Sequence, residues 1–248
     1  EDNPTQEANI FTFNLEQPTQ EQLVREYKKS ITIDAAKNNS SDVVLYVRTE
    51  DNAGNVNIVK SDPIDIDVTA PSIDITYNNN KDNNGNSYFA AKRTATVTIT
   101  ERPNHFDQND ATKGIKIIEK DLKGNSINDS YTISNWKTVV NKSNPDKSTH
   151  TATISFNKDA NYNFSIGYTD KAGNVNSTVK TNNSVAPYKF TVDTTAPTGM
   201  IKAVSAEGRT EEWDKLCNSL RFGYWSNKKI AISSTSSDIT SPIAKVEY

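Results

Sequence analysis

Apolar and polar residues alternate along several short segments of the chain. In segment 162–169, aromatic residues and isoleucine alternate with small polar residues. In segment 94–100, an alanine, a valine and an isoleucine alternate with threonines, and segment 43–48 shows a similar alternation. A period of two that is rich in β-branched and aromatic residues predicts strands that bury one face against a second layer. The chain is therefore predicted to be all-β and to form β-sandwiches.

Two segments depart from this alternation and predict short helices. The segment that begins at Thr19-Gln-Glu-Gln22 has a capping-box pattern, and apolar residues follow it at i, i+4 spacing. The segment 210–220 places Trp213, Leu216 and Leu220 on one helical face. Both segments are expected to be helical insertions that link strands.

The chain repeats itself at a period of domain size. Residues 43–57 correspond to residues 162–176, and both copies contain an Asp-x-Ala-Gly-Asn turn between two apolar segments. Downstream of each copy, Thr-Ala-Pro occurs at 69–71 and again at 195–197. A repeat of this length is one domain rather than a short solenoid unit, so the sequence predicts a tandem array.

The two Thr-Ala-Pro sites predict the domain boundaries. Proline fixes its own φ and restricts the residue before it, which makes each site a stiff, extended joint. Residues 71–196 are then one complete unit. Residues 1–70 are expected to be the later strands of another unit, or a variant of it, and residues 197–248 the opening strands of a further one.

Several motifs of the chain resemble those of a known family. They are the turns at 51–55 and 170–174, the joint at 193–198, the segment 100–106, and the spacing of residues across 213–248. These motifs are similar to bacterial immunoglobulin-like (Big-type) tandem repeats, which occur in large secreted or cell-wall-anchored surface proteins of Gram-positive gut bacteria. The resemblance covers most of the chain beyond residue 40.

The resemblance implies tandem immunoglobulin-like β-sandwiches with two short helical insertions, in an extracellular protein that is secreted or held at the bacterial cell surface. It also implies a role for Tyr162 in Asp159-Ala-Asn-Tyr162. This segment is similar to the corner before the sixth strand of immunoglobulin sandwiches, where a tyrosine hydroxyl bonds to upstream backbone. At the matching place the first repeat has Asp42-Val43 and lacks the tyrosine.

Charge and composition exclude several classes of protein. The chain has 28 Lys and Arg against 31 Asp and Glu, a net charge of −3, so it lacks the basic footprint of a nucleic-acid-binding protein. It has no run of 18 apolar residues, which argues against membrane insertion. A single cysteine, Cys217, excludes an intramolecular disulfide.

Clustered aspartates suggest a metal. Calcium prefers six to eight oxygen ligands, and Asp51, Asp67, Asp170 and Asp193 stand at the repeated turns and next to the joints. The resemblance implies that calcium can stiffen such joints, although aspartate is also an ordinary turn residue. By contrast, the catalytic motifs for phosphate loops, nucleophilic serines and zinc hydrolases are missing from the sequence, so the chain is predicted not to be an enzyme.

Aromatic residues near the C-terminus suggest a binding surface. Trp213, Phe222, Tyr224 and Trp225 are side chains of the kind that dominate interfaces, and the alternative is that they fill the core. The resemblance implies adhesion to a host protein or glycan, with host immunoglobulin or another glycoprotein among the ligands, and the stiff joints add a role as a rigid spacer. The alternative is an accessory immunoglobulin-like or carbohydrate-binding module of a secreted glycan-degrading enzyme.

Overall fold

The structure is a computed structural model that describes residues 30, 32–35, 39–80, 87–121, 123–128, 130–176, 178–182, 188–206, 212, 215 and 230–247. By its contacts the chain divides into a first unit, residues 1–38, and a second unit, residues 39–248. Every strand and helix reported below belongs to the second unit. The described part is mostly β-strand, in agreement with the all-β prediction.

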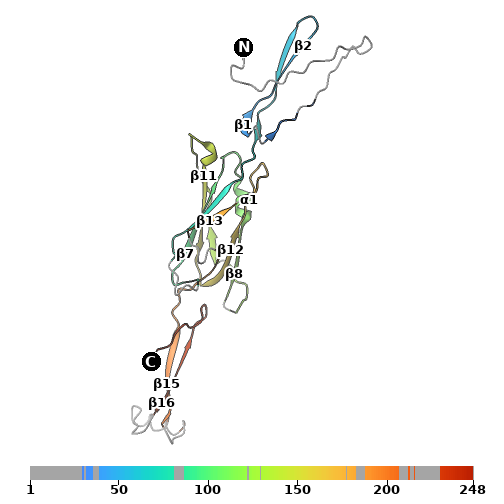
Figure 1. The fold of residues 1–248 in the computed structure, drawn as a ribbon. Helices are drawn as coiled ribbons and strands as arrows, with labels where there is room; N and C mark the ends of the chain where they lie inside the picture. The colour runs from blue at the N-terminus through green and yellow to red at the C-terminus, as the bar shows by residue number, and fades with distance from the viewer. Residues whose placement is uncertain are drawn as a thin grey trace. The chain divides into compact units, whose positions relative to one another are not determined.

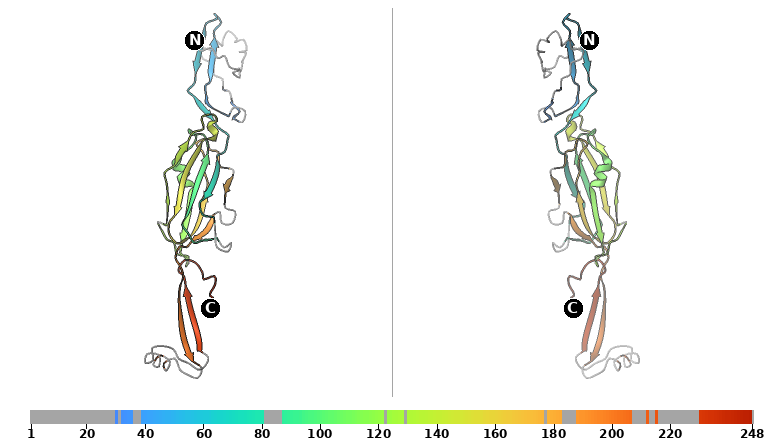
Figure 2. Two further views of the ribbon diagram at one scale, coloured as in Figure 1. Left: turned by 90° about the vertical axis from the view of Figure 1, so that its left-hand side faces the viewer. Right: turned by 90° about the vertical axis from the view of Figure 1, so that its right-hand side faces the viewer.

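Ten strands between residues 72 and 192 form two sheets (Figures 1 and 2). The first sheet has the order β10 (Lys137–Val139), β11 (Thr149–Phe156), β7 (Arg93–Thr100), β5 (Ser72–Tyr77) and β13 (Val179–Thr181), with β9 (Tyr131–Ile133) also paired to β11. The second has the order β6 (Tyr88–Phe89), β14 (Lys189–Val192), β12 (Ala160–Ile166) and β8 (Ile115–Lys120). Neighbouring strands are antiparallel except β13 with β5 and β14 with β6. A 3-10 turn, Pro145–Lys147, precedes β11.

One hydrophobic core joins the two sheets. Buried and half-buried residues alternate strictly along β7 and β11, as the period-two pattern of the sequence predicts. The inward side chains of the first sheet pack against aromatic residues of the second, and Phe156 meets Phe190 edge to face at 4.9 Å between ring centroids. The fully buried apolar side chains come from both sheets and include Ile75, Ala95, Val97, Ile99, Ile154, Phe156, Tyr162, Phe164 and Val192.

The opposite face of the first sheet carries hydroxyl side chains. Along the paired strands β7 and β11, Thr96 lies opposite Thr153 and Thr98 lies opposite Thr151. These threonines are half-buried, and they alternate with the core residues of the same strands. The threonines supply the β-branched residues that strands favour, and they place polar groups on the face that does not enter the core.

A charged residue is part of this core. The side chain of Arg93 is fully buried, and its guanidinium carbon lies 3.7 Å from the ring centroid of Tyr77 and 4.4 Å from that of Phe190. Its Nε donates a hydrogen bond to the backbone carbonyl of Asn79 at 3.0 Å. Contacts with aromatic faces and a hydrogen bond together offset the cost of removing this charge from water.

The segment 108–114 forms a short helix that the hydrophobic pattern does not predict. Helix α1 (Gln108–Gly114) is capped by Asp107, whose carboxylate accepts hydrogen bonds from the Asn109 and Asp110 amides. Ala111 is its only buried residue, so the helix has no apolar stripe that a periodicity argument could detect. The helix ends where Gly114 passes close to Gly167.

Residues 39–66 form two small sheets instead of a half-buried layer. Strand β1 (Ser40–Val43) pairs with β4 (Ile64–Ile66), and β2 (Tyr46–Glu50) pairs with β3 (Val56–Lys60). Every residue of β2 and β3 is exposed, including Val47 and Ile58 at more than half. The prediction that segment 43–48 buries one face is wrong for residues 46–48, which lie in the exposed β2, because a two-stranded hairpin has no second layer of its own; residues 43–45 are half-buried.

Strands β15 (Thr198–Ala206) and β16 (Ile230–Ser237) form a third two-stranded sheet. Among the described strands, no ladder crosses residues 67–71 or 193–197, where the two Thr-Ala-Pro joints lie. The helix expected after Thr19 lies outside the described residues. The one expected over 210–220 also lies outside them, apart from Glu212 and Lys215.

Candidate functional site

The predicted Asp-x-Ala-Gly-Asn turn has one geometry in both copies. In the copy at 170–174, Oδ1 of Asp170 accepts hydrogen bonds from the Ala172 and Asn174 amides, and Oδ2 accepts one from Nδ2 of Asn174. The backbone turns back at Gly173, whose φ of +95° is accessible to glycine without strain. The copy at 51–55 makes the same set of bonds.

A third copy of this turn lies at residues 121–125, in the sequence Asp-Leu-Lys-Gly-Asn. Asn125 donates through its amide and its side chain to the two oxygens of Asp121, and Gly124 has a φ of +85°. Sequence comparison within the chain overlooks it because the residues between the aspartate and the glycine differ. The hydrogen bonds of this turn therefore require the aspartate, the glycine and the asparagine, and not the two residues between the aspartate and the glycine.

The turn at 170–174 differs from the other two because it contacts the first joint. The side-chain amide of Asn174 donates a second hydrogen bond, at 3.1 Å, to the backbone carbonyl of Asp67. Asp170 is buried, whereas Asp51 is exposed and Asp121 is half-buried. The same local motif therefore serves as a plain hairpin turn at one place and as part of a joint at another.

Two further contacts join residues 39–67 to the loop between β7 and α1. Asn104 donates from Nδ2 to Oδ2 of Asp65 at 2.8 Å, and the guanidinium of Arg102 donates to the hydroxyl of Ser41. Arg102 also forms an ion pair with Asp146 at 2.6 Å. The loop thus binds the segment before the first joint by several polar contacts.

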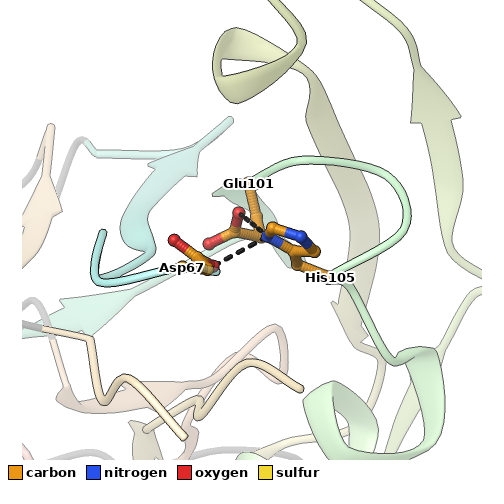
Figure 3. A group of neighbouring side chains, drawn as sticks. All are labelled: Asp67, Glu101 and His105. Carbon is orange, nitrogen blue, oxygen red and sulfur yellow. Dashed lines mark ion pairs between the residues drawn. The ribbon is translucent and has the colours of Figure 1, made fainter. Parts of the chain in front are cut away.

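Three titratable side chains converge at this joint: Asp67, Glu101 and His105 (Figure 3). Nδ1 of His105 lies 2.7 Å from Oδ2 of Asp67 and 3.8 Å from Oε1 of Glu101. One ligand atom from each residue falls within 4.8 Å of the other two. In the figure, both interactions run from the imidazole to the two carboxylates, which approach it from different chain segments.

The joint cluster, by which we mean Asp67, Glu101 and His105, is shielded from solvent. The exposed fractions of the three side chains are 6%, 5% and 8%. Burial raises the pKa of Glu101 to about 7, and the nearby charge of Asp67 acts in the same direction, while a hydrogen bond from the Arg102 amide opposes both. Two carboxyl groups and an imidazole in such a place can hold a cation or share a proton.

The hydrogen bonds of the joint cluster are incomplete. Oδ2 of Asp67 is close to Nδ1 of His105, but the geometry does not meet that of a hydrogen bond, and this oxygen has no other partner among the described residues. Nε2 of His105 is also without a hydrogen bond within the described part of the chain, and lies 3.7 Å from Oδ2 of Asp65. Buried polar atoms without partners are rare in folded proteins.

The four aspartates predicted as calcium ligands do not meet at one place. Asp67 belongs to the joint cluster, and Asp170 lies in the turn beside it, with its oxygens occupied by the hydrogen bonds of that turn. Asp51 is in the exposed turn between β2 and β3. Asp193 is at the second joint, where its oxygens accept hydrogen bonds from the Thr195 amide and the Ser241 hydroxyl.

The second joint is held by another carboxylate. Asp159, which precedes β12, accepts hydrogen bonds from the amide and hydroxyl of Thr194, each at 2.9 Å, and from the hydroxyl of Thr195. Burial acts to raise the pKa of Asp159, but these hydrogen bonds outweigh it and the pKa is lowered. Side chains from residues 101–174 therefore form hydrogen bonds with the chain at or next to both Thr-Ala-Pro joints.

The sequence interpretation did not identify Glu101 and His105 as functional candidates. They are four residues apart in the segment 100–106, and a carboxylate and an imidazole at that spacing are a weak signal for a shared ligand. The third member, Asp67, lies 34 residues before Glu101 in the sequence, so no local motif contains all three. The predicted binding residues Trp213, Phe222, Tyr224 and Trp225 lie outside the described residues.

Within the part of the chain that the structure describes, no helix is long and apolar enough to cross a membrane. Comparison with protein-family models, with curated proteins and with solved structures finds no match to this chain.

Proposed function

We propose that the chain is a non-catalytic, extracellular segment of a bacterial surface protein, composed of immunoglobulin-like β-sandwiches, that binds a host macromolecule and acts as a rigid spacer. The strand order supports the immunoglobulin-like assignment. The order β10-β11-β7-β5 corresponds to the D-E-B-A sheet of such a domain, and the order β8-β12-β14 corresponds to C-F-G.

A second observation supports the same assignment. The hydroxyl of Tyr162 lies 2.8 Å from the backbone carbonyl of Lys158 and 3.0 Å from that of Ser130. Immunoglobulin domains tie the start of their sixth strand to upstream backbone in this way. The hydroxyl of Tyr162 thus makes the kind of contact that the resemblance implies, and this contact supports the immunoglobulin-like arrangement among the possible two-sheet arrangements.

The observation that carries the spacer function is the bracing of both joints. At the first joint, Asn174 bonds to the backbone of Asp67 and Asn104 bonds to Asp65. At the second, Asp159 bonds to Thr194 and Thr195. A flexible linker between domains would have solvated backbone and few such contacts, whereas a spacer needs joints that resist bending.

Rigidity is tested by a distance measurement on the whole chain. Cys217 is replaced by serine, and spin labels are attached to cysteines at the exposed positions Asn57 and Lys137. A braced joint gives one narrow distribution of label-to-label distances by pulsed electron paramagnetic resonance. A broad distribution, like that of a flexible linker, would contradict the spacer function.

Binding is tested with the same protein. The chain is immobilised and exposed to host mucosal proteins, including immunoglobulin, and to a glycan array. Saturable binding to a host protein or glycoprotein supports adhesion. Binding restricted to structural polysaccharides would favour an accessory module of a glycan-degrading enzyme, and no saturable binding to either class would contradict the proposal.

A further inference from the structure

The strongest unexplained feature of the molecule is the joint cluster. Its two carboxylates and one imidazole are each more than nine-tenths buried, and Oδ2 of Asp67 and Nε2 of His105 have no hydrogen bond among the described residues. Burying three ionisable groups together costs free energy of folding unless something compensates their charges.

We propose that the joint cluster binds a divalent first-row transition metal of the zinc class, with Asp67, Glu101 and Nδ1 of His105 as its protein ligands. Carboxylate oxygen and imidazole nitrogen are the usual ligands of such ions, and three protein ligands leave a fourth position for water. The inference goes beyond the proposed function, and it does not depend on which macromolecule the chain binds.

The distances suit such an ion after a small adjustment. Ligand atoms about 2.1 Å from a tetrahedral zinc ion are about 3.4 Å from one another. Nδ1 of His105 is 2.7 Å from the Asp67 oxygen and 3.8 Å from the Glu101 oxygen, so the required value falls between the two. The other oxygen of Asp67 accepts a hydrogen bond from the Thr69 amide, which orients the carboxylate.

The neighbouring carboxylates argue against calcium. Asp65 accepts hydrogen bonds from the Asp42 amide and from Asn104, and the oxygens of Asp170 are bonded within their turn. Calcium needs six or more oxygen ligands, and the joint cluster supplies two carboxylates and a nitrogen. Asp65 instead lies on the Nε2 side of His105, where a carboxylate commonly orients a metal-binding imidazole.

Such an ion would join two segments that are distant in the sequence. Asp67 precedes the Ala70-Pro71 joint, whereas Glu101 and His105 belong to the loop between β7 and α1. A metal bound by all three cross-links the joint. The consequence is that metal binding stabilises the joint in addition to the hydrogen bonds from Asn174 and Asn104.

The test consists of two titrations of the chelator-treated full chain. Calorimetry measures the binding of Zn²⁺, and the absorption spectrum of Co²⁺ reports the coordination geometry. We expect one equivalent of each ion to bind, with the Co²⁺ spectrum of a four-coordinate site. His105→Gln and Asp67→Asn should each weaken zinc binding by about tenfold or more, since even residues that only support a ligand cost that much. Asp193→Asn is the matched control and should bind zinc like the unaltered chain.

Thermal unfolding of each metal-free variant shows whether it folds. If His105→Gln does not fold, the zinc affinity of Asp67→Asn alone tests the proposed ligands. Failure of the unaltered chain to bind zinc stoichiometrically would overturn the proposal. So would zinc binding that is equal in Asp67→Asn and the unaltered chain. Calcium binding that is as tight as zinc binding and unaffected by His105→Gln would replace the assigned metal class by calcium. None of these outcomes depends on host binding, so the spacer and adhesion functions are tested separately.

Discussion

The side-chain amide of Asn174 donates one hydrogen bond to the carboxylate of Asp170 in its own turn and another to the backbone carbonyl of Asp67. The first bond stabilises the hairpin turn, and the second bonds that turn to the residue just before the first joint. The equivalent asparagine at 125 makes the first kind of bond alone among the described residues. A comparison of the two asparagines therefore separates the stability that comes from the turn from the stability that comes from the contact with the joint.

We predict that Asn174→Ala costs more than Asn125→Ala by about 1 kcal/mol in the free energy of unfolding, because it removes one additional, partly buried hydrogen bond to the backbone carbonyl of Asp67. Chemical denaturation of both variants measures the difference. In the spin-label experiment, Asn174→Ala should also broaden the distance distribution between positions 57 and 137, whereas Asn125→Ala should not. Equal effects of the two substitutions would show that Asn174 acts in its turn alone.

The corner tyrosine is tested by Tyr162→Phe. The substitution removes the hydroxyl that donates to the carbonyls of Lys158 and Ser130, while the Ser130 carbonyl keeps its hydrogen bond from the Asn157 amide. The expected loss is about 1–2 kcal/mol of unfolding free energy. Tyr131→Phe, at a partly buried tyrosine of β9, is the control and should cost less. Equal stability of Tyr162→Phe and the unaltered chain would contradict the role of the hydroxyl.

The close approach of α1 to the end of β12 predicts a sharp difference between two glycines. A Cβ at Gly114 would lie 1.9 Å from the carbonyl oxygen of Gly167, which belongs to backbone and cannot rotate away. A Cβ at Gly167 would meet its nearest atom, in the side chain of Asn176, at 3.8 Å. We expect Gly114→Ala to lower the free energy of unfolding by about 2 kcal/mol or more, and Gly167→Ala by less than about 1 kcal/mol. Thermal unfolding of both variants checks the order.

The buried histidine of β11 predicts a dependence of stability on pH. Burial lowers the pKa of His150 below its usual 6.5, although its hydrogen bond to the Glu101 carbonyl acts in the opposite direction. The unfolded chain then binds this proton at a higher pH than the folded chain does. The contribution of His150 is therefore complete above pH 6.5 and is lost as the pH falls through the lower pKa of the folded state.

The comparison is with His150→Gln, which cannot titrate in this range. The stability of the unaltered chain minus that of the variant should decrease between pH 7 and pH 5, as measured by denaturation at each pH. A difference that stays constant or grows over this range would contradict the lowered pKa. Because the other titrating groups are common to both proteins, they cancel in the subtraction unless they couple to His150.

The sequence predicts those strands in which one face lies in the core and the other face lies outside it. Strands β7 and β12 alternate between core and outer face, so their inward residues could be named from the pattern. The strand β2 has a similar pattern, but its valine and tyrosine are exposed, because alternation indicates which residues share a face and not whether another layer covers that face. Helix α1 is short and almost entirely polar, so it depends on its Asp107 cap and on tertiary contacts, which propensity does not reveal.

The candidate site was predictable only in part. The sequence singles out Asp67, because aspartates beside turns and joints have an evident local role, and on the same ground it singles out Asp170, which lies in the neighbouring turn and is not part of the joint cluster. Glu101 and His105 were not, because their importance depends on the fold bringing the β7–α1 loop against a residue from before the joint. The neighbours that use up the oxygens of Asp170 are equally invisible in the sequence. Which carboxylate remains available to a ligand is therefore a property of the folded chain.

The threonines on the outer face of β7 and β11 affect how readily this sheet associates with the sheets of other molecules. Strands of high β-propensity usually carry valine and isoleucine, which make an open face prone to stick to other sheets. Here the branched side chains end in hydroxyl groups, and pairs such as Thr96 and Thr153 present polar atoms over the width of two strands. This face therefore offers little apolar surface to the sheet of another molecule, and association through it is not favoured.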